Sequence, residues 1–107
     1  MSNYRFMRTL VLFDLPVLKA SQRKEYRRFI KLLKTEGFYM LQESVYVKMS
    51  INQAAVDATM EVLEKNKPKE GLVASLTITE KQFASMVFIV GESTTDVINS
   101  DERFIEL

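Results

Sequence analysis

Few side chains in this sequence could carry out covalent or metal chemistry, and Asp14 is the best placed of them. The 107 residues include no cysteine and no histidine. Disulfides, thiol chemistry and cysteine–zinc sites are therefore excluded, and the commonest general base is missing. Any catalysis must use carboxylates, hydroxyls, cations or a hard metal ion such as Mg²⁺, which prefers oxygen ligands.

Asp14 follows a run of five apolar and β-favouring residues, 9–13, and precedes Pro16 by two positions. An unbroken run of this kind predicts a strand that is buried on both faces. Pro16 cannot donate a hydrogen bond to a ladder, so the strand should end near Asp14. The carboxylate is thus expected at the C-terminal end of a central strand, where a rigid sheet can support a site. The other interpretation is that Asp14 only caps the turn that follows.

The second candidate is a group of cations on the segment 22–36, whose periodicity predicts a helix. Ser21 is expected as its N-cap and Gly37 as the residue that ends it. Its apolar stripe consists of Tyr26, Phe29, Ile30 and Leu33.

At about 100° per residue, the cations of this helix share an arc of about 140°. They are Arg23, Lys24, Arg27, Arg28, Lys31 and Lys34. Such a one-signed face is typical of a surface that binds nucleic-acid phosphates. The alternative is a solvated outer face, which usually carries both signs.

The remaining composition is that of an ordinary globular protein, with 47% hydrophobic and 27% charged residues and a net charge of +1. No run is long enough to cross a bilayer, and residues 1–6 lack a signal-peptide pattern, so a cytoplasmic protein is expected. We found no repeat, low-complexity segment or linker, and we therefore predict a single domain over residues 1–107.

The rest of the chain supplies the elements that must position these residues. The polar middle of residues 38–49 leaves open one kinked strand or two short ones. Asn52 should cap a second helix that runs to about Asn66 and carries an acidic outer face with Asp57, Glu61 and Glu64. The later expectations are a turn at 65–71, a strand at 72–79, a short connection at 80–85, an apolar strand at 86–90, a loop at 92–100 and a final strand at 103–107.

This order favours an α+β fold, a ferredoxin-like βαββαβ sandwich with an extra C-terminal strand and both helices on one face of an antiparallel sheet. The strands at 9–13 and 86–90 are apolar at consecutive positions, so the second face must be covered as well. A second copy of the chain is the predicted cover, which makes the protein a homodimer. Alternatively, the C-terminal segment folds back over its own sheet, and a swapped C-terminal strand would combine both arrangements.

Several short segments, in order along the chain, carry a resemblance to a known family. They are Leu-Phe-Asp-Leu-Pro at 12–16, Glu-Gly-Phe at 36–38, Gln-Glu-Ser-Val-Tyr at 42–46, Leu-Thr-Ile-Thr-Glu-Lys-Gln-Phe at 76–83 and Asn-Ser-Asp-Glu-Arg at 99–103. Together they resemble the CRISPR-associated Cas2 family, in the branch of type II-A systems. The similarity covers nearly the whole chain.

The resemblance implies a ferredoxin-like homodimer in which Asp14 faces its own copy across the dimer axis. It implies a Mg²⁺-dependent endonuclease acting on RNA or DNA, with Asp14 as the catalytic and metal-binding residue. It also implies the central dimer of the spacer integrase complex, which bridges Cas1 integrase subunits around double-stranded prespacer DNA. Single-stranded RNA is an alternative substrate.

Other functions compete with this one. Two carboxylates make a sparse cage, so Mg²⁺ would bind weakly unless phosphate oxygens complete its shell. A non-catalytic DNA-binding adaptor needs only the cations of the first helix. A ribonuclease toxin of related fold is a further alternative, as is an RNA-recognition-motif-like module. That module needs exposed aromatic side chains on its central strands. Phe6, Phe13 and Phe88 could supply them, although we expect these rings in the core.

Overall fold

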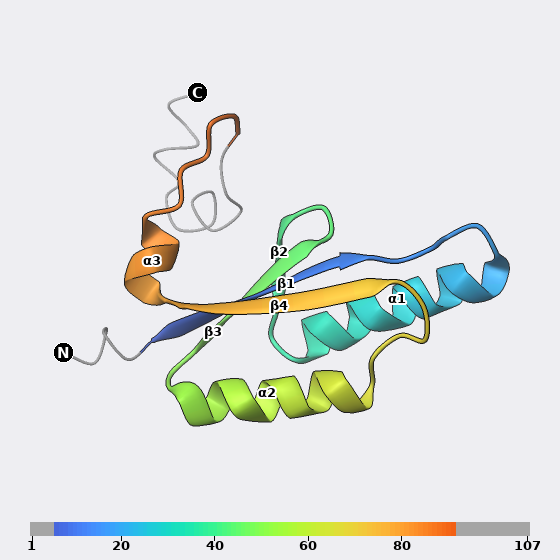
Figure 1. Ribbon diagram of the computed structural model, residues 1–107, viewed down its shortest axis with the longest axis horizontal. Helices are drawn as coiled ribbons and strands as arrows, with labels where there is room; N and C mark the ends of the chain where they lie inside the picture. The colour runs from blue at the N-terminus through green and yellow to red at the C-terminus, as the bar shows by residue number, and fades with distance from the viewer. Residues whose placement is uncertain (1–5, 92–107) are drawn as a thin grey trace.

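The computed structural model describes residues 6–91, and these form an antiparallel sheet with two long helices on one face (Figure 1). The order of the strands across the sheet is β2-β3-β1-β4. This order and the βαββαβ sequence of elements are those of a ferredoxin-like fold, so the predicted α+β class is confirmed. The elements are β1 (Met7–Asp14), α1 (Ala20–Thr35), β2 (Tyr39–Gln42), β3 (Val45–Ser50), α2 (Gln53–Lys65), β4 (Leu72–Thr79) and α3 (Glu80–Ala84).

The main core lies between the sheet and the helices α1 and α2. Because side chains alternate along a strand, Val11 and Phe13 of β1 share the face that meets the helices. They pack with Phe29 and Leu33 of α1, and Val11, Phe29 and Leu33 are at most 1% exposed. The rings of Phe13 and Phe29 meet edge to face at 5.3 Å. The predicted apolar stripe of the first helix is therefore its buried side.

Both ends of α1 are closed by local hydrogen bonds. The N-cap is Lys19, whose backbone N–H donates to the side-chain oxygen of Gln22 at 2.9 Å, so the prediction of Ser21 as N-cap was wrong by two residues. Gln22, three residues after the cap, accepts from the N–H of the cap residue itself, which is the reciprocal half of a capping box. At the other end, Gly37 has a φ of +98°, and Phe38 N–H donates to Leu33 C=O at 2.9 Å, as in a Schellman motif.

The segment 38–49, which the sequence left open, forms two strands. β2 and β3 make a hairpin whose turn includes Ser44 with a φ of +67°, and the register shifts between Met40 and Gln42. The second helix matches its prediction, because the side chain of Asn52 accepts a hydrogen bond from the backbone N–H of Ala55 at 2.9 Å. None of the helices between residues 6 and 91 has the length and apolar character needed to cross a bilayer.

β4 pairs with β1 in an unbroken register from Met7 opposite Thr79 to Asp14 opposite Leu72. β1 is therefore central, between β3 and β4, as predicted. The outer edge of β4 has no strand partner among residues 6–91. Leu72 and Leu76 of β4 are 69% and 56% exposed, and they lie on the sheet face opposite the helices.

The predicted strand at 86–90 is absent, and this expectation was wrong. After α3 the chain passes over the opposite face of the sheet, where Met86 and Phe88 pack against the cluster of Leu10, Leu41 and Val47. Val87, Ile89 and Val90 are 79–91% exposed. The alternation of packed and exposed residues suits a strand, but a strand needs a ladder, and no described strand lies alongside this segment. The loop at 92–100 and the strand at 103–107 lie outside the described residues.

Candidate nucleic-acid interface and strand-end carboxylate

Asp14 is the last residue of β1 and its side chain is exposed. It has the same parity as Leu10 and Leu12, so it belongs to the sheet face opposite the helices. Its carboxylate makes no hydrogen bond or ion pair with any other residue of the described chain. The predicted position at the end of a central strand is therefore observed, and the carboxylate is available to an external ligand. Its role as a catalytic or metal-binding residue stays a prediction.

The backbone around Asp14 is held closely by the turn that leads into β4. Gly71 has a φ of +96°, and a Cβ atom on it would lie 2.7 Å from the carbonyl oxygen of Asp14 and 2.8 Å from Leu15 Cδ2. Only glycine fits such an approach at such a φ. The sequence marked 65–71 as a turn, but it did not show that the glycine of this turn touches Asp14, which is 57 positions earlier in the chain.

The described part of one copy, residues 6–91, does not provide a complete metal site. Within residues 6–91 there is no group of three or more acidic, histidine or cysteine side chains that could hold a metal ion. Mg²⁺ requires near-octahedral oxygen coordination, and a single carboxylate supplies at most two of those oxygens. A carboxylate has the right chemistry for Mg²⁺. If Asp14 binds Mg²⁺, the remaining ligands have to come from outside residues 6–91, for example from water, a second copy of Asp14 or the phosphates of a substrate.

The structure divides the six predicted cations into two groups. Two of them are used inside the protein. The guanidinium of Arg23 donates to the carbonyl oxygens of Val17 and Leu18, at 3.1 and 2.7 Å, and so fixes the loop between β1 and α1.

Arg28 is the second cation used internally. It forms two hydrogen bonds of 3.0 Å to the Glu25 carboxylate and a third of 2.9 Å to the carbonyl oxygen of Asn66 at the end of α2. The hydrogen bond to Arg28 holds the pKa of Glu25 below its usual value, and the pKa of Arg28 is raised by the same bond. This side chain joins the two helices and is not a free phosphate contact.

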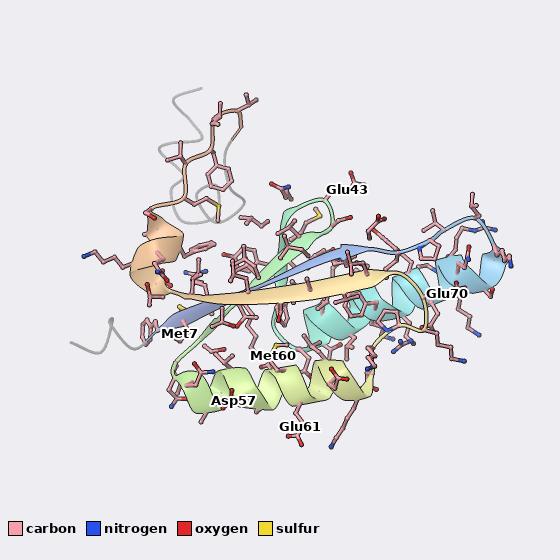
Figure 2. The ribbon with its side chains drawn as sticks, in the orientation of Figure 1. Met7, Glu43, Asp57, Met60, Glu61 and Glu70 are labelled. Atoms are coloured by element: carbon pink, nitrogen blue, oxygen red, sulfur yellow. The ribbon has the colours of Figure 1, made fainter. Side chains whose placement is uncertain are left out.

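The other four cations are exposed and make no hydrogen bond or ion pair with residues 6–91. They are Lys24, Arg27, Lys31 and Lys34. α2 presents the opposite charge: Figure 2 shows Glu61 on the outer side of α2 and Met60 on the side toward the sheet. The positive helix face is therefore real, but it is narrower than the sequence predicted.

Three of the free cations line an open groove of about 570 Å³ on the surface of α1. Arg27, Lys31 and Lys34 lie in this groove with Tyr26, Ile30 and Thr35. The sequence did not predict the groove, because it depends on how much of Tyr26 and Ile30 the sheet leaves uncovered. Both side chains are half-buried against the main core.

A second groove, of about 480 Å³, lies between the start of α1 and the turn that precedes β4. Lys19, Lys24 and Lys69 line it, but so do Glu25 and Glu70. Glu70 accepts a hydrogen bond from the side-chain amide of Gln22 at 3.0 Å. This groove is mixed in charge, and it is a weaker candidate for phosphate binding than the first.

The central strands present no ring for base stacking on the sheet face opposite the helices. Phe13 of β1 and Tyr46 of β3 lie on the helix side and are 6% and 5% exposed. Phe88 packs on the opposite face from the segment after α3, not from a strand. The expectation of these rings in the core is confirmed for Phe13, and base recognition by the RNA-recognition-motif arrangement is not supported.

These features define a small ferredoxin-like protein with an exposed carboxylate at the end of its central strand and a cationic first helix. The model of the family described as CRISPR associated protein Cas2 matches residues 7–86. The chain belongs to this family, as the resemblance indicated.

Two curated relatives and one solved structure illustrate the similarity. A "CRISPR-associated endoribonuclease Cas2" of Treponema denticola is 50% identical over 101 residues, which cover 94% of this chain and all of the relative. A protein of the same name from Streptococcus mutans is 46% identical and covers 94% and 93% of the two chains. A structure described as "Crystal structure of cas2" superposes with a TM-score of 0.59 at 22% identity and covers 84% of this chain and 92% of its own, which supports the fold.

Proposed function

We propose that this protein is the nucleic-acid-binding dimer at the centre of the spacer integrase complex in a CRISPR system, where it holds double-stranded prespacer DNA between Cas1 subunits. Membership of the Cas2 family supports the CRISPR context. The observation that carries the binding role is the set of exposed cations on α1 that have no partner within residues 6–91. Cations without internal partners are free to contact phosphates, and phosphate contacts supply most of the affinity of non-specific DNA binding.

The proposed contact is with phosphates and involves no reading of bases in the duplex. Each phosphate contact contributes about 0.9 to the slope of log affinity against log salt. A variant that combines Arg27→Ala and Lys31→Ala should reduce that slope by about two contacts for each copy that lies on the DNA, with a loss of stability of no more than about 0.5 kcal/mol per residue. The measurement is the affinity for duplex DNA over a series of salt concentrations.

A matched control removes two surface lysines that form ion pairs with acidic residues of the same chain. Lys65 and Lys67 of the 65–71 turn approach Glu61 and Glu64 at 3.7 and 2.6 Å. Lys65→Ala with Lys67→Ala changes the net charge equally and should leave the slope unchanged. If the α1 variant keeps the parental slope and the control loses it, the DNA-binding surface is the turn and not α1.

Dimer formation is the second part of the proposal. Leu72 and Leu76 are exposed on β4, whose outer edge has no strand partner among residues 6–91, and Val87, Ile89 and Val90 are exposed beyond α3. An apolar surface of this kind on a small protein is typical of an interface between subunits. Either a second sheet or a swapped C-terminal segment from a second copy would cover it.

Sedimentation at micromolar concentration should show a dimer. Leu76→Asp should shift the protein toward the monomer while the helical circular dichroism stays unchanged. Ala58→Asp, on the exposed side of α2, introduces the same charge away from this face and should leave the dimer intact. A folded parent protein that sediments as a monomer would refute this part of the proposal.

The third part of the proposal is metal-dependent cleavage of RNA or DNA at Asp14. The names of the curated relatives describe an endoribonuclease. Two Asp14 carboxylates that face each other would repel unless one is protonated or a cation lies between them. Mg²⁺ held there, weakly and with help from substrate phosphates, would supply activation of water for phosphodiester hydrolysis.

Asp14→Asn tests this role. The variant should lose Mg²⁺-dependent cleavage of single-stranded RNA and of DNA while its dimer and its DNA affinity persist. Unchanged cleavage would place the activity in another residue or in a contaminant. If neither the parent nor the variant cleaves, the protein is a non-catalytic adaptor. The lack of a larger ligand cluster among residues 6–91 favours this alternative over a ribonuclease toxin of related fold.

A further inference from the structure

We propose that the groove on α1 is a subsite for an unpaired nucleotide, in which the base packs against Tyr26 and Ile30 and the phosphates meet Arg27, Lys31 and Lys34. The inference rests on the proposed nucleic-acid binding and extends it from phosphate contact to the recognition of single strands. Duplex DNA keeps its bases stacked inside the helix, so a duplex can use only the cations of this groove.

The arrangement of the lining side chains carries the argument. Arg27, Lys31 and Lys34 line one groove with no acidic residue among the lining residues. Positions 27 to 34 extend over about 10 Å of helix at 1.5 Å per residue. The charge of this groove is therefore complementary to a chain of phosphates rather than to a single ion.

Tyr26 and Ile30 give the same groove an apolar floor. The ring of Tyr26 is fixed from behind by Phe13, at 6.2 Å between ring centres and an interplanar angle of 64°. The residue as a whole is only partly buried, and it lines the groove. A rigid, partly exposed aromatic ring beside cations is the arrangement with which proteins bind single strands, since every base offers a π-face.

The position of the groove separates it from the carboxylate. Tyr26 lies in the second turn of α1 and packs on the helix side of the sheet, whereas Asp14 belongs to the opposite face. The subsite would therefore hold a single-stranded part of a substrate without contacting the proposed cleavage site. Because Arg27, Lys31 and Lys34 also belong to the free cations proposed to contact duplex phosphates, a duplex and a single strand would compete for this groove.

The first experiment compares natural and abasic single strands of about ten nucleotides, which carry the same phosphates. Stacking on an aromatic side chain contributes about 1–3 kcal/mol per base, so the natural strand should bind the parent protein roughly 5- to 100-fold more tightly. Tyr26→Leu should remove this difference, whereas Tyr26→Phe should keep it. Affinity for a duplex should change less than about twofold in both variants.

Arg27→Ala is the matched control, because it should weaken the natural strand, the abasic strand and the duplex alike. Equal affinities of the parent protein for natural and abasic strands would overturn the subsite, and this test does not depend on the stability of Tyr26→Leu. An acidic protein segment would then be the better candidate ligand for the groove. Binding of neither strand nor duplex would reject the proposed DNA-binding function as well, so the two failures are distinguishable.

Discussion

The two faces of the sheet are built from alternate residues of the same strands, but they are covered very differently. On the helix side, Val11 and Phe13 are 0% and 6% exposed. On the other side, Leu10 is buried at 8% under the segment after α3, whereas Leu12 is 41% exposed and Leu76 is 56% exposed. Along β1 the helix side is therefore closed, whereas residues 6–91 cover the opposite side of this strand at Leu10 and leave Leu12 partly exposed.

The closed end of the opposite face depends on one polar cluster. Arg8 forms two hydrogen bonds with the Glu80 carboxylate, at 2.6 and 3.0 Å, and a third with the Tyr39 hydroxyl at 2.9 Å. Its guanidinium also lies 4.5 Å from the ring centre of Phe83. These contacts hold α3 against the sheet. They do not extend to the exposed side chains of Leu12 and Leu76. The difference shows that apolar residues on both faces of a strand indicate two covers, one of which residues 6–91 supply only in part.

The largest expected effect is on the helix side. Phe29→Ala should lower the free energy of unfolding by about 3–5 kcal/mol, because it leaves a cavity among fully buried side chains. Urea unfolding measures the change. Leu76→Ala on the opposite face should cost far less in the dilute monomer, and its cost should grow with protein concentration if a second copy covers this face. If Phe29→Ala and Leu76→Ala lowered the unfolding free energy of the dilute protein equally, the two faces would not differ in packing as described.

Gly71→Ala should have the next largest effect. The left-handed backbone costs a non-glycine residue about 1–2 kcal/mol, and the new Cβ would also push against the carbonyl of Asp14. Gly37→Ala is the matched control, since φ is +98° there but the nearest atom is the flexible end of Lys48 at 3.5 Å. The difference between the two losses, measured by thermal unfolding, isolates the contact at the end of β1. A larger loss at Gly37 would contradict it.

Arg8→Lys should cost about 1–2 kcal/mol, because lysine keeps the charge but cannot form the fork of hydrogen bonds to Glu80. Amide hydrogen exchange in this variant should accelerate at residues 80–88 and stay slow in α1. This result would show that the cover of the opposite face opens independently of the core on the helix side. Arg28→Lys is the control, because that ion pair with Glu25 is exposed at 41% and 35% of the two side chains. Its loss should be smaller, about 1 kcal/mol or less, because the variant gives up an exposed ion pair and one exposed hydrogen bond to the Asn66 carbonyl.

The smallest effect concerns Tyr46, which lies on the helix side of β3. Burial raises the pKa of its hydroxyl, and the neighbouring Tyr26 adds to the shift. Because the folded pKa exceeds the unfolded value of about 10, the associated stability is complete below that pH and is lost as the pH rises through the folded pKa. Tyr46→Phe should therefore flatten the alkaline decline in unfolding free energy. A decline identical to that of the parent would assign it to other groups.

The features that the sequence predicted well are those with local causes. β1 ends at Asp14 because Pro16 follows, and Gly37 ends α1 because of its own backbone. The prediction of a strand at 86–90 failed for a non-local reason. A strand requires a neighbouring strand to form a hydrogen-bonded ladder, and residues 6–91 supply none beside this segment.

The candidate site shows the same limit. Helical spacing correctly placed the cations on one side of α1, but it could not show that Arg28 bonds to Asn66, which is 38 residues away. Nor could it show that Tyr26 stays partly exposed after α1 packs on the sheet. The bond of Arg28 and the exposure of Tyr26 both depend on how α1 packs against α2 and the sheet. The spacing of residues within one helix cannot predict that packing.

The open edge of β4 has a practical consequence for handling the protein. It is an eight-residue strand with exposed Leu72, Val73 and Leu76 and no neighbour along one side among residues 6–91. An edge of this length offers a template for strand addition to any chain with free backbone groups. The nearest charges that could discourage such growth are Lys69 and Glu70 before the strand and Glu80 and Lys81 after it. Preparations in which this edge is uncovered should therefore precipitate or form fibres when they are concentrated. Substitution of a charged residue on β4 should keep the protein in solution.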